Sequence, residues 1–224
     1  MSSLSGVGIF WAIMSFIASV GGSIGFYMPY WLSGHMHDED KTPVYFGVFR
    51  RCNYPRQVEG KIEMVLECGR YTTFLDIPSI SWQIATLTLG VGCGLAMLVA
   101  FTSILAVCIR GVVTPSVAKA AGIIQLCSVG RTFLPKACCL QEVRDISGLQ
   151  GLLMGAGVGI YPNGWDTPEV QQACGYKSSS YNMGDCEFFW SFYLVASGSG
   201  LTLICALLSC HASKKKTSIP EYQL

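Results

Sequence analysis

Apolar stretches long enough to cross a membrane alternate with polar segments along this chain. Four stretches contain no Asp, Glu, Lys or Arg: residues 1–34, 77–109, 146–165 and 188–213. A helix needs ~20 mostly apolar residues to cross the hydrocarbon core of a bilayer. We therefore predict an all-α membrane protein, a bundle of four transmembrane helices. The expected spans are about 7–28, about 82–109, about 117–126 continued by 149–161, and about 188–211.

The charges between these spans predict their orientation. Lys214, Lys215 and Lys216 directly follow the last span, and Arg110 and Lys119 flank the link after the second. Cytoplasmic loops carry such an excess of Lys and Arg. Two longer loops mix acids with bases, at about 31–78 and about 163–187. We predict a multi-pass protein of the plasma membrane with these two loops outside and with the N-terminus and the tail, residues 212–224, in the cytoplasm.

The third span is interrupted in the sequence. Five charged residues and a proline stand between its two apolar halves: Arg131, Lys136, Glu142, Arg144, Asp145 and Pro135. Charges inside hydrocarbon are costly. Removal of Cys127–Gly148 would join Leu126 to Leu149 in one apolar helix. We interpret residues 127–148 as an insert from a retained intron or a mispredicted exon; the alternative is a true variant with a cytoplasmic excursion.

Four of the eleven cysteines lie in the loops predicted to be outside, where oxidation is permitted. Cys52 and Cys68 lie in the first loop, and Cys174 and Cys186 in the second. Four cysteines allow three pairings. Pairing within each loop is the simplest, and each such disulfide would contribute ~3 kcal/mol in the chain-entropy model.

The first outer loop has the pattern of a small antiparallel sheet. Residues 44–50 and 62–67 are rich in β-branched and aromatic residues and read as strands. Asn53-Tyr54-Pro55 and Glu59-Gly60 between them are typical of turns. We expect this sheet to rest on the outer ends of the helices.

Composition and motifs exclude several functions. Charged residues make up 13% of the chain and the net charge is +1, with no basic stripe that would bind nucleic acid. Gly21–Gly25 matches the G-x-S-x-G of hydrolases, but it lies within an apolar span instead of a strand-to-helix turn. His35, His37 and Asp38 are more typical of a solvated loop than of a metal site. We predict no enzyme, no cofactor and no metal.

Small residues recur at four-residue spacing in three of the spans, as at Gly21 and Gly25. Glycine lets helices approach closely in lipid. Packing inside one bundle explains this spacing, and a homo-oligomer or a partner helix remains an alternative. Trp31 and Trp165 stand at the outer ends of spans, where interfacial tryptophans belong. We also expect Trp31 to pack under the sheet.

Several motifs together resemble one family. Trp31, Gly47-Val48-Phe49, Cys52 and Cys68 resemble the claudin pattern, although Phe49 stands where claudins have Trp. The chain is more similar to the lipoma HMGIC fusion partner-like tetraspan family, nearest its founding branch. The segments that carry this likeness are Pro29-Tyr30-Trp31, residues 49–55, 67–71 and 77–79, Tyr161–Asp166 with Gly164 and Trp165, Cys174-Gly175-Tyr176 and Gly184–Glu187. Phe189, before Trp190, stands where the family is expected to have Gly.

The resemblance implies a claudin-like fold and an accessory role. Characterised relatives act as auxiliary subunits of ion channels or receptors, one in hair-cell mechanotransduction and one with inhibitory GABA-A receptors. We therefore expect a scaffolding or auxiliary subunit of another integral membrane protein, a channel or receptor. A claudin-like adhesion or paracellular-barrier protein is the alternative. The chain end, with Tyr222 and Leu224, has the form of a peptide that adds a strand to a PDZ domain.

Overall fold

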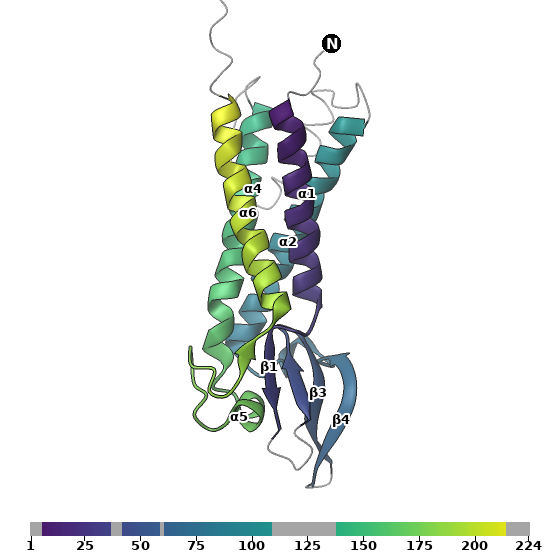
Figure 1. Cartoon of the computed structure of the whole chain (residues 1–224), viewed down its shortest axis with the longest axis vertical. Helices are drawn as coiled ribbons and strands as arrows, with labels where there is room; N and C mark the ends of the chain where they lie inside the picture. Colours follow the sequence, from purple (N-terminus) through teal and green to yellow (C-terminus); the bar gives the residue numbers. More distant parts are fainter. Residues whose placement is uncertain (1–5, 37–41, 59–60, 109–137, 214–224) are drawn as a thin grey trace, which may run out of the picture.

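The computed structural model describes residues 6–36, 42–58, 61–108 and 138–213. These residues form four long helices, a five-stranded sheet and short helical turns. The long helices are α1 (Gly6–Tyr27), α2 (Ile80–Cys108), α4 (Cys138–Ile160) and α6 (Trp190–Ser213). They run together as a bundle, and the sheet lies beyond one end of it (Figure 1). The start of α1 and the end of α6 lie at the opposite end.

Three of the described helices are long and apolar enough to cross a membrane. Their apolar parts are Phe10–Tyr27, Ile80–Thr102 and Trp190–Leu207. Helices α1, α2 and α6 contain no Asp, Glu, Lys or Arg. Their outward faces are apolar, as at Phe16, Leu87 and Ile204. Exposure of so many apolar side chains to water would cost free energy, so these outward faces are suited to contact with lipid.

Helix α4 differs from its expected course. It begins at Cys138, so residues 138–148 are helical and continuous with the apolar segment that follows. Leu, Gln, Glu and Arg in this stretch favour a helix, which explains the continuity. The charge-free part, residues 146–160, reaches only about 22 Å at 1.5 Å per residue. Residues 117–137 of the expected span and insert lie outside the described part of the chain.

The sheet is antiparallel and has the order β4-β3-β2-β1-β5. Its strands are β1 (Leu32–His35), β2 (Pro43–Phe46), β3 (Arg50–Val58), β4 (Lys61–Arg70) and β5 (Glu187–Phe188). The first four come from the first loop, and β5 comes from the second. Pairing of β1 with β5 therefore joins the two loops in one sheet.

The strand predicted over residues 44–50 is wrong in part, because the chain turns at residues 47–49 and β3 begins at Arg50. The Gly47 amide donates to the Arg50 carbonyl at 2.8 Å, which closes this turn. A Cβ on Gly47 would lie 2.8 Å from the Cα of Pro29, so only glycine fits here. The turn predicted at residues 53–55 is instead a bulge inside β3. Asn53 adopts a φ of 53° and its side-chain amide donates to the Pro43 carbonyl at 2.9 Å.

Three short helical turns connect the sheet to the bundle: η1 (Phe74–Asp76), η2 (Tyr161–Gly164) and α5 (Pro168–Cys174). Helix α5 starts with a proline at its first position, where the missing N–H has no cost. It packs beside β1 (Figure 1). The whole is the claudin-like arrangement: a four-helix bundle that carries a small antiparallel sheet at one end.

Candidate functional site: the sheet and its junction with the bundle

Three buried aromatic residues join the sheet to the helices. The indole of Trp82 stacks on Tyr161 with ring centroids 5.1 Å apart, and Trp31 meets the edge of Tyr161 at 4.9 Å. The Trp82 indole N–H donates to the Tyr161 carbonyl at 2.9 Å, and the Tyr161 hydroxyl donates to the Phe46 carbonyl at 3.1 Å. Each of the three aromatic side chains is fully buried. Because their polar atoms are bonded, this junction core is rigid as well as apolar.

Trp31 and Trp165 are expected from their positions to be interfacial tryptophans at the ends of spans, but the structure buries both rings. Trp31 is 0% exposed and Trp165 is 2% exposed, so neither ring reaches lipid. The Trp31 indole instead donates to the carbonyl of Gly25 at 2.8 Å, one of the last carbonyls of α1. Trp31 does pack against the sheet, because its side chain belongs to the same buried cluster as Leu32 of β1 and Phe46 of β2. Trp190, at the start of α6, is the tryptophan of this region that is partly exposed.

Two further motif residues serve packing at this junction. A Cβ on Gly164 would lie 2.5 Å from Cδ1 of Trp82, so glycine at this position lets the indole enter the core. Phe49 stands beside the end of α1, with its ring 5.0 Å from Phe26 and 6.4 Å from Tyr27. The aromatic position of the claudin-like motif is thus occupied by a smaller ring that still packs on the first helix.

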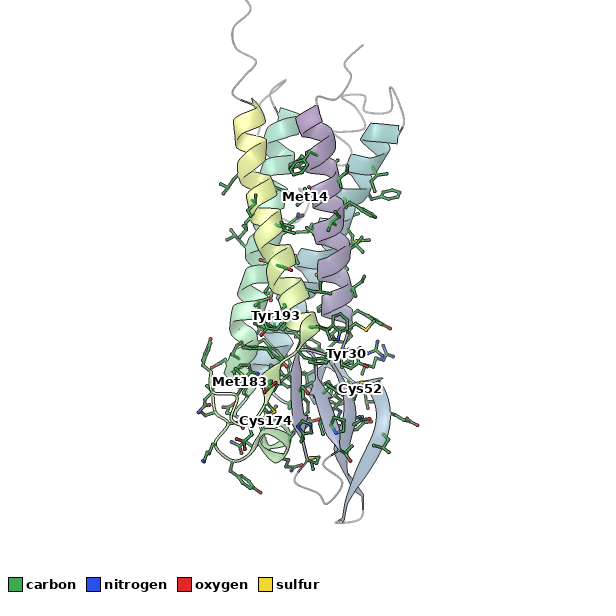
Figure 2. The ribbon with its side chains drawn as sticks, viewed as in Figure 1. Met14, Tyr30, Cys52, Cys174, Met183 and Tyr193 are labelled. Carbon is green, nitrogen blue, oxygen red and sulfur yellow. A yellow bond between two sulfur atoms is a disulfide. The ribbon has the colours of Figure 1, made fainter. Side chains whose placement is uncertain are left out.

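Disulfides close both loops. Cys52 pairs with Cys68 across β3 and β4, and Cys174 pairs with Cys186 between α5 and β5. Figure 2 shows Cys52 and Cys174 on the sheet side of the junction. Each bond joins residues of one loop, so β1–β5 pairing and side-chain contacts must join one loop to the other.

An ion pair between the loops makes one such contact. The Arg51 guanidinium on β3 donates to the Glu169 carboxylate on α5, and the Tyr71 hydroxyl donates to the same carboxylate at 3.4 Å. The guanidinium also lies over the rings of Tyr54, at 3.8 Å, and Tyr71, at 4.5 Å. Burial, together with the nearby Glu169 charge, raises the pKa of Tyr71 well above its usual value, so the hydroxyl remains a donor. We call Arg51, Glu169 and Tyr71 the loop clamp.

The outer side of the junction presents aromatic residues. Tyr30 lies centrally, with ring centroids 5.1 Å from Tyr45, 6.0 Å from Phe189 and 5.7 Å from Trp190. Phe189 and Trp190 are 37% and 39% exposed. Figure 2 places Tyr30 and Tyr193 at the level where the sheet meets the bundle. We call Tyr30, Tyr45, Phe189 and Trp190 the junction aromatic cluster.

A second accessible feature is the outer strand of the sheet. β4 pairs with β3 along one side and stands at the end of the strand order. Leu66 on this strand is 70% exposed. A strand at the edge of a sheet has backbone groups that can pair with another strand. The sheet therefore offers both backbone and aromatic contacts to a neighbour.

Sequence reasoning missed Trp82 and Glu169, and it quoted Tyr161, Arg51 and Tyr71 within the family motifs without assigning them a role. Tyr161 and Trp82 stand at span ends, where aromatic residues are expected at the interface, and only packing distinguishes a buried ring from a lipid-facing one. Arg51 and Glu169 are 118 residues apart, and no pattern in either loop relates them. Tyr222 and Leu224 lie outside the described residues.

Comparison with known proteins agrees with this architecture. The family model of lipoma HMGIC fusion partner-like protein matches residues 7–143 and 143–214. The chain is 27% identical to LHFPL tetraspan subfamily member 2 protein of Homo sapiens over 217 residues, covering 90% of this chain and 85% of that protein.

Two other relatives are similarly close. Member 2a of Danio rerio is 28% identical, over 90% of this chain and 84% of the relative. Member 4 of Mus musculus is 25% identical, over 100% of this chain and 78% of the relative. The nearness to the founding branch stays a prediction. The chain is a multi-pass membrane protein that belongs to the lipoma HMGIC fusion partner-like protein family.

Proposed function

We propose that this protein is a non-enzymatic auxiliary or scaffolding subunit that binds another integral membrane protein, a channel or receptor, and assists its trafficking or gating. It acts at the plasma membrane with both termini in the cytoplasm. The sheet and the lipid-facing sides of the helices form the binding surface.

The observation that carries this proposal is the combination of a rigid sheet with accessible binding features. One disulfide joins β3 to β4, and the other closes the second loop between the end of α5 and the residue before β5. The buried junction core fixes the sheet to the bundle, and the loop clamp joins it to α5. The sheet nevertheless leaves the edge of β4 accessible, and in the junction aromatic cluster Phe189 and Trp190 are exposed while Tyr30 and Tyr45 are half-buried. A preorganised surface loses little conformational entropy when it binds, and aromatic residues supply much of the binding energy in protein interfaces.

The composition of the spans favours a supporting role over conduction. Helices α1, α2 and α6 carry no Asp, Glu, Lys or Arg, and neither do residues 146–160 of α4, whose three charged residues stand in its first eight positions. Ion and proton pathways are usually marked by such residues inside the membrane. The disulfides also favour the outward orientation of the sheet, since they form in oxidising compartments.

Quantitative surface proteomics after loss of this protein tests the proposal. We expect the surface amount of one channel or receptor to fall, and re-expression of the wild-type chain to restore it. A variant with Tyr30 and Phe189 changed to Ala should reach the surface and restore it poorly. A chain that concentrates in strands at cell–cell contacts, with no change in any other membrane protein, would support adhesion instead.

A further inference from the structure

A short apolar projection stands where the first loop returns to the membrane. Phe74 and Leu75, both in η1, are 42% and 80% exposed, and Ile80, the first residue of α2, is 74% exposed. Single exposed apolar residues are ordinary, but three within seven positions beside the start of a span are a local concentration of apolar surface. We call these three residues the apolar foot.

The backbone of this connection is fixed, so the foot has a defined direction. The Thr73 amide donates to the Asp76 carboxylate at 2.7 Å, which closes the turn of η1. Ile77, at 4% exposed, fastens the turn to the core. The hydroxyl of Ser79 accepts the Trp82 amide at 3.0 Å and caps the start of α2. The exposure of Phe74 and Leu75 therefore belongs to an ordered turn between two anchored points.

The foot continues a face of α2 that is apolar and exposed along much of its length. That face carries Ile84, Leu87, Val91 and Leu98, which are between 43% and 56% exposed and recur at helical spacing. In a spanning helix such a face contacts acyl chains. Ile80 begins the same face, and η1 lies only three residues before it in the chain. Phe74 and Leu75 are therefore exposed apolar residues at the end of the bundle where this lipid-facing surface begins.

We propose that the apolar foot inserts into the interfacial region of the outer leaflet and binds phospholipid there, so that the first loop is tied to the bilayer surface as well as to the bundle. Apolar and aromatic side chains partition favourably into this zone. The tie would fix the height of the sheet above the membrane. This proposal stands independently of the proposed partner.

Site-specific photo-crosslinking in nanodiscs tests it. The photoreactive residue p-benzoylphenylalanine is placed at Leu75, and nanodiscs contain phosphatidylcholine with an alkyne on its acyl chain. The matched control carries the probe at Leu66, which is 70% exposed on β4. Leu66 lies four residues before the strand ends at Arg70, about 13 Å along the strand from that end. We expect strong lipid labelling at position 75 and little at position 66.

Equal labelling at the two positions, or no lipid at position 75, would overturn the proposal. A crosslink from position 75 to a second copy of the chain would also overturn it, since the foot would then be a protein interface. If the probe at position 75 disturbs folding, Leu75→Trp gives a second measurement. The tryptophan emission of this variant, after subtraction of the wild-type emission, should be quenched by dibrominated lipid. Absence of quenching would refute insertion.

Discussion

Truncation of Trp31 should lower the free energy of unfolding more than truncation of any partly exposed aromatic residue at the junction between sheet and bundle. The ring is fully buried between Tyr161, at 4.9 Å, and Phe192, at 5.7 Å. Replacement of a buried Trp by Ala costs about 3–5 kcal/mol through lost burial and the cavity left behind. For a chain of 150–250 residues each kcal/mol lowers Tm by roughly 2–4 °C, so we expect Trp31→Ala to lower Tm by about 6–20 °C.

Two variants separate packing from hydrogen bonding. Trp31→Phe keeps most of the ring but leaves the Gly25 carbonyl without its donor, for a loss of about 1 kcal/mol and about 2–4 °C. Trp190→Ala is the matched control, because this indole also packs against aromatic rings, such as that of Tyr30, but is 39% exposed. Melting followed by size-exclusion chromatography of detergent-solubilised protein gives the three shifts. Equal shifts for Trp31→Ala and Trp190→Ala would refute this reasoning.

Three further predictions concern the loops and the third helix. Replacing Cys52 or Cys68 by Ser opens the disulfide between β3 and β4, which closes a separation of 16 residues and contributes ~3 kcal/mol. We therefore expect surface biotinylation to detect less protein. A free thiol at either position in wild-type surface protein would contradict this. Alanine replacement of Arg51 and Glu169 should show a coupling of about 1–2 kcal/mol in a double-mutant cycle, because each single change leaves a largely buried partner without its ion pair. Additive losses of stability would argue against the loop clamp. Deletion of residues 127–148 should raise the yield of membrane-inserted protein, because it lengthens an apolar segment that spans only about 22 Å of a ~30 Å hydrocarbon core. An equal yield of the full chain would show that residues 127–148 are tolerated.

The spans and the presence of the sheet follow from pattern alone. Charge-free stretches place α1, α2 and α6, because hydrocarbon excludes charge over a known thickness. The alternation around residue 64 indicates a strand, because one face of an antiparallel sheet packs while the other is solvated. These are signals carried by local composition.

Other features depend on contacts that a single sequence does not encode locally. The turn at Gly47 looks like the middle of a strand, and it turns because Pro29 approaches from the end of α1. Trp31 and Trp190 occupy equivalent places at span ends, yet packing buries one and exposes the other. The helical conformation of residues 138–148 reflects helix propensity in a segment whose charges argued against a span.

The most direct test of an auxiliary role is the composition of the complex that this protein forms in native membranes. Gentle solubilisation, chemical cross-linking at the cell surface and mass spectrometry of the purified complex measure it. We predict a complex with one channel or receptor, with cross-links from the edge of β4 or the junction aromatic cluster to that partner, and loss of the complex on changing Tyr30 and Phe189 to Ala. A chain that purifies alone or only with copies of itself, and does so equally with and without these changes, would contradict the proposal.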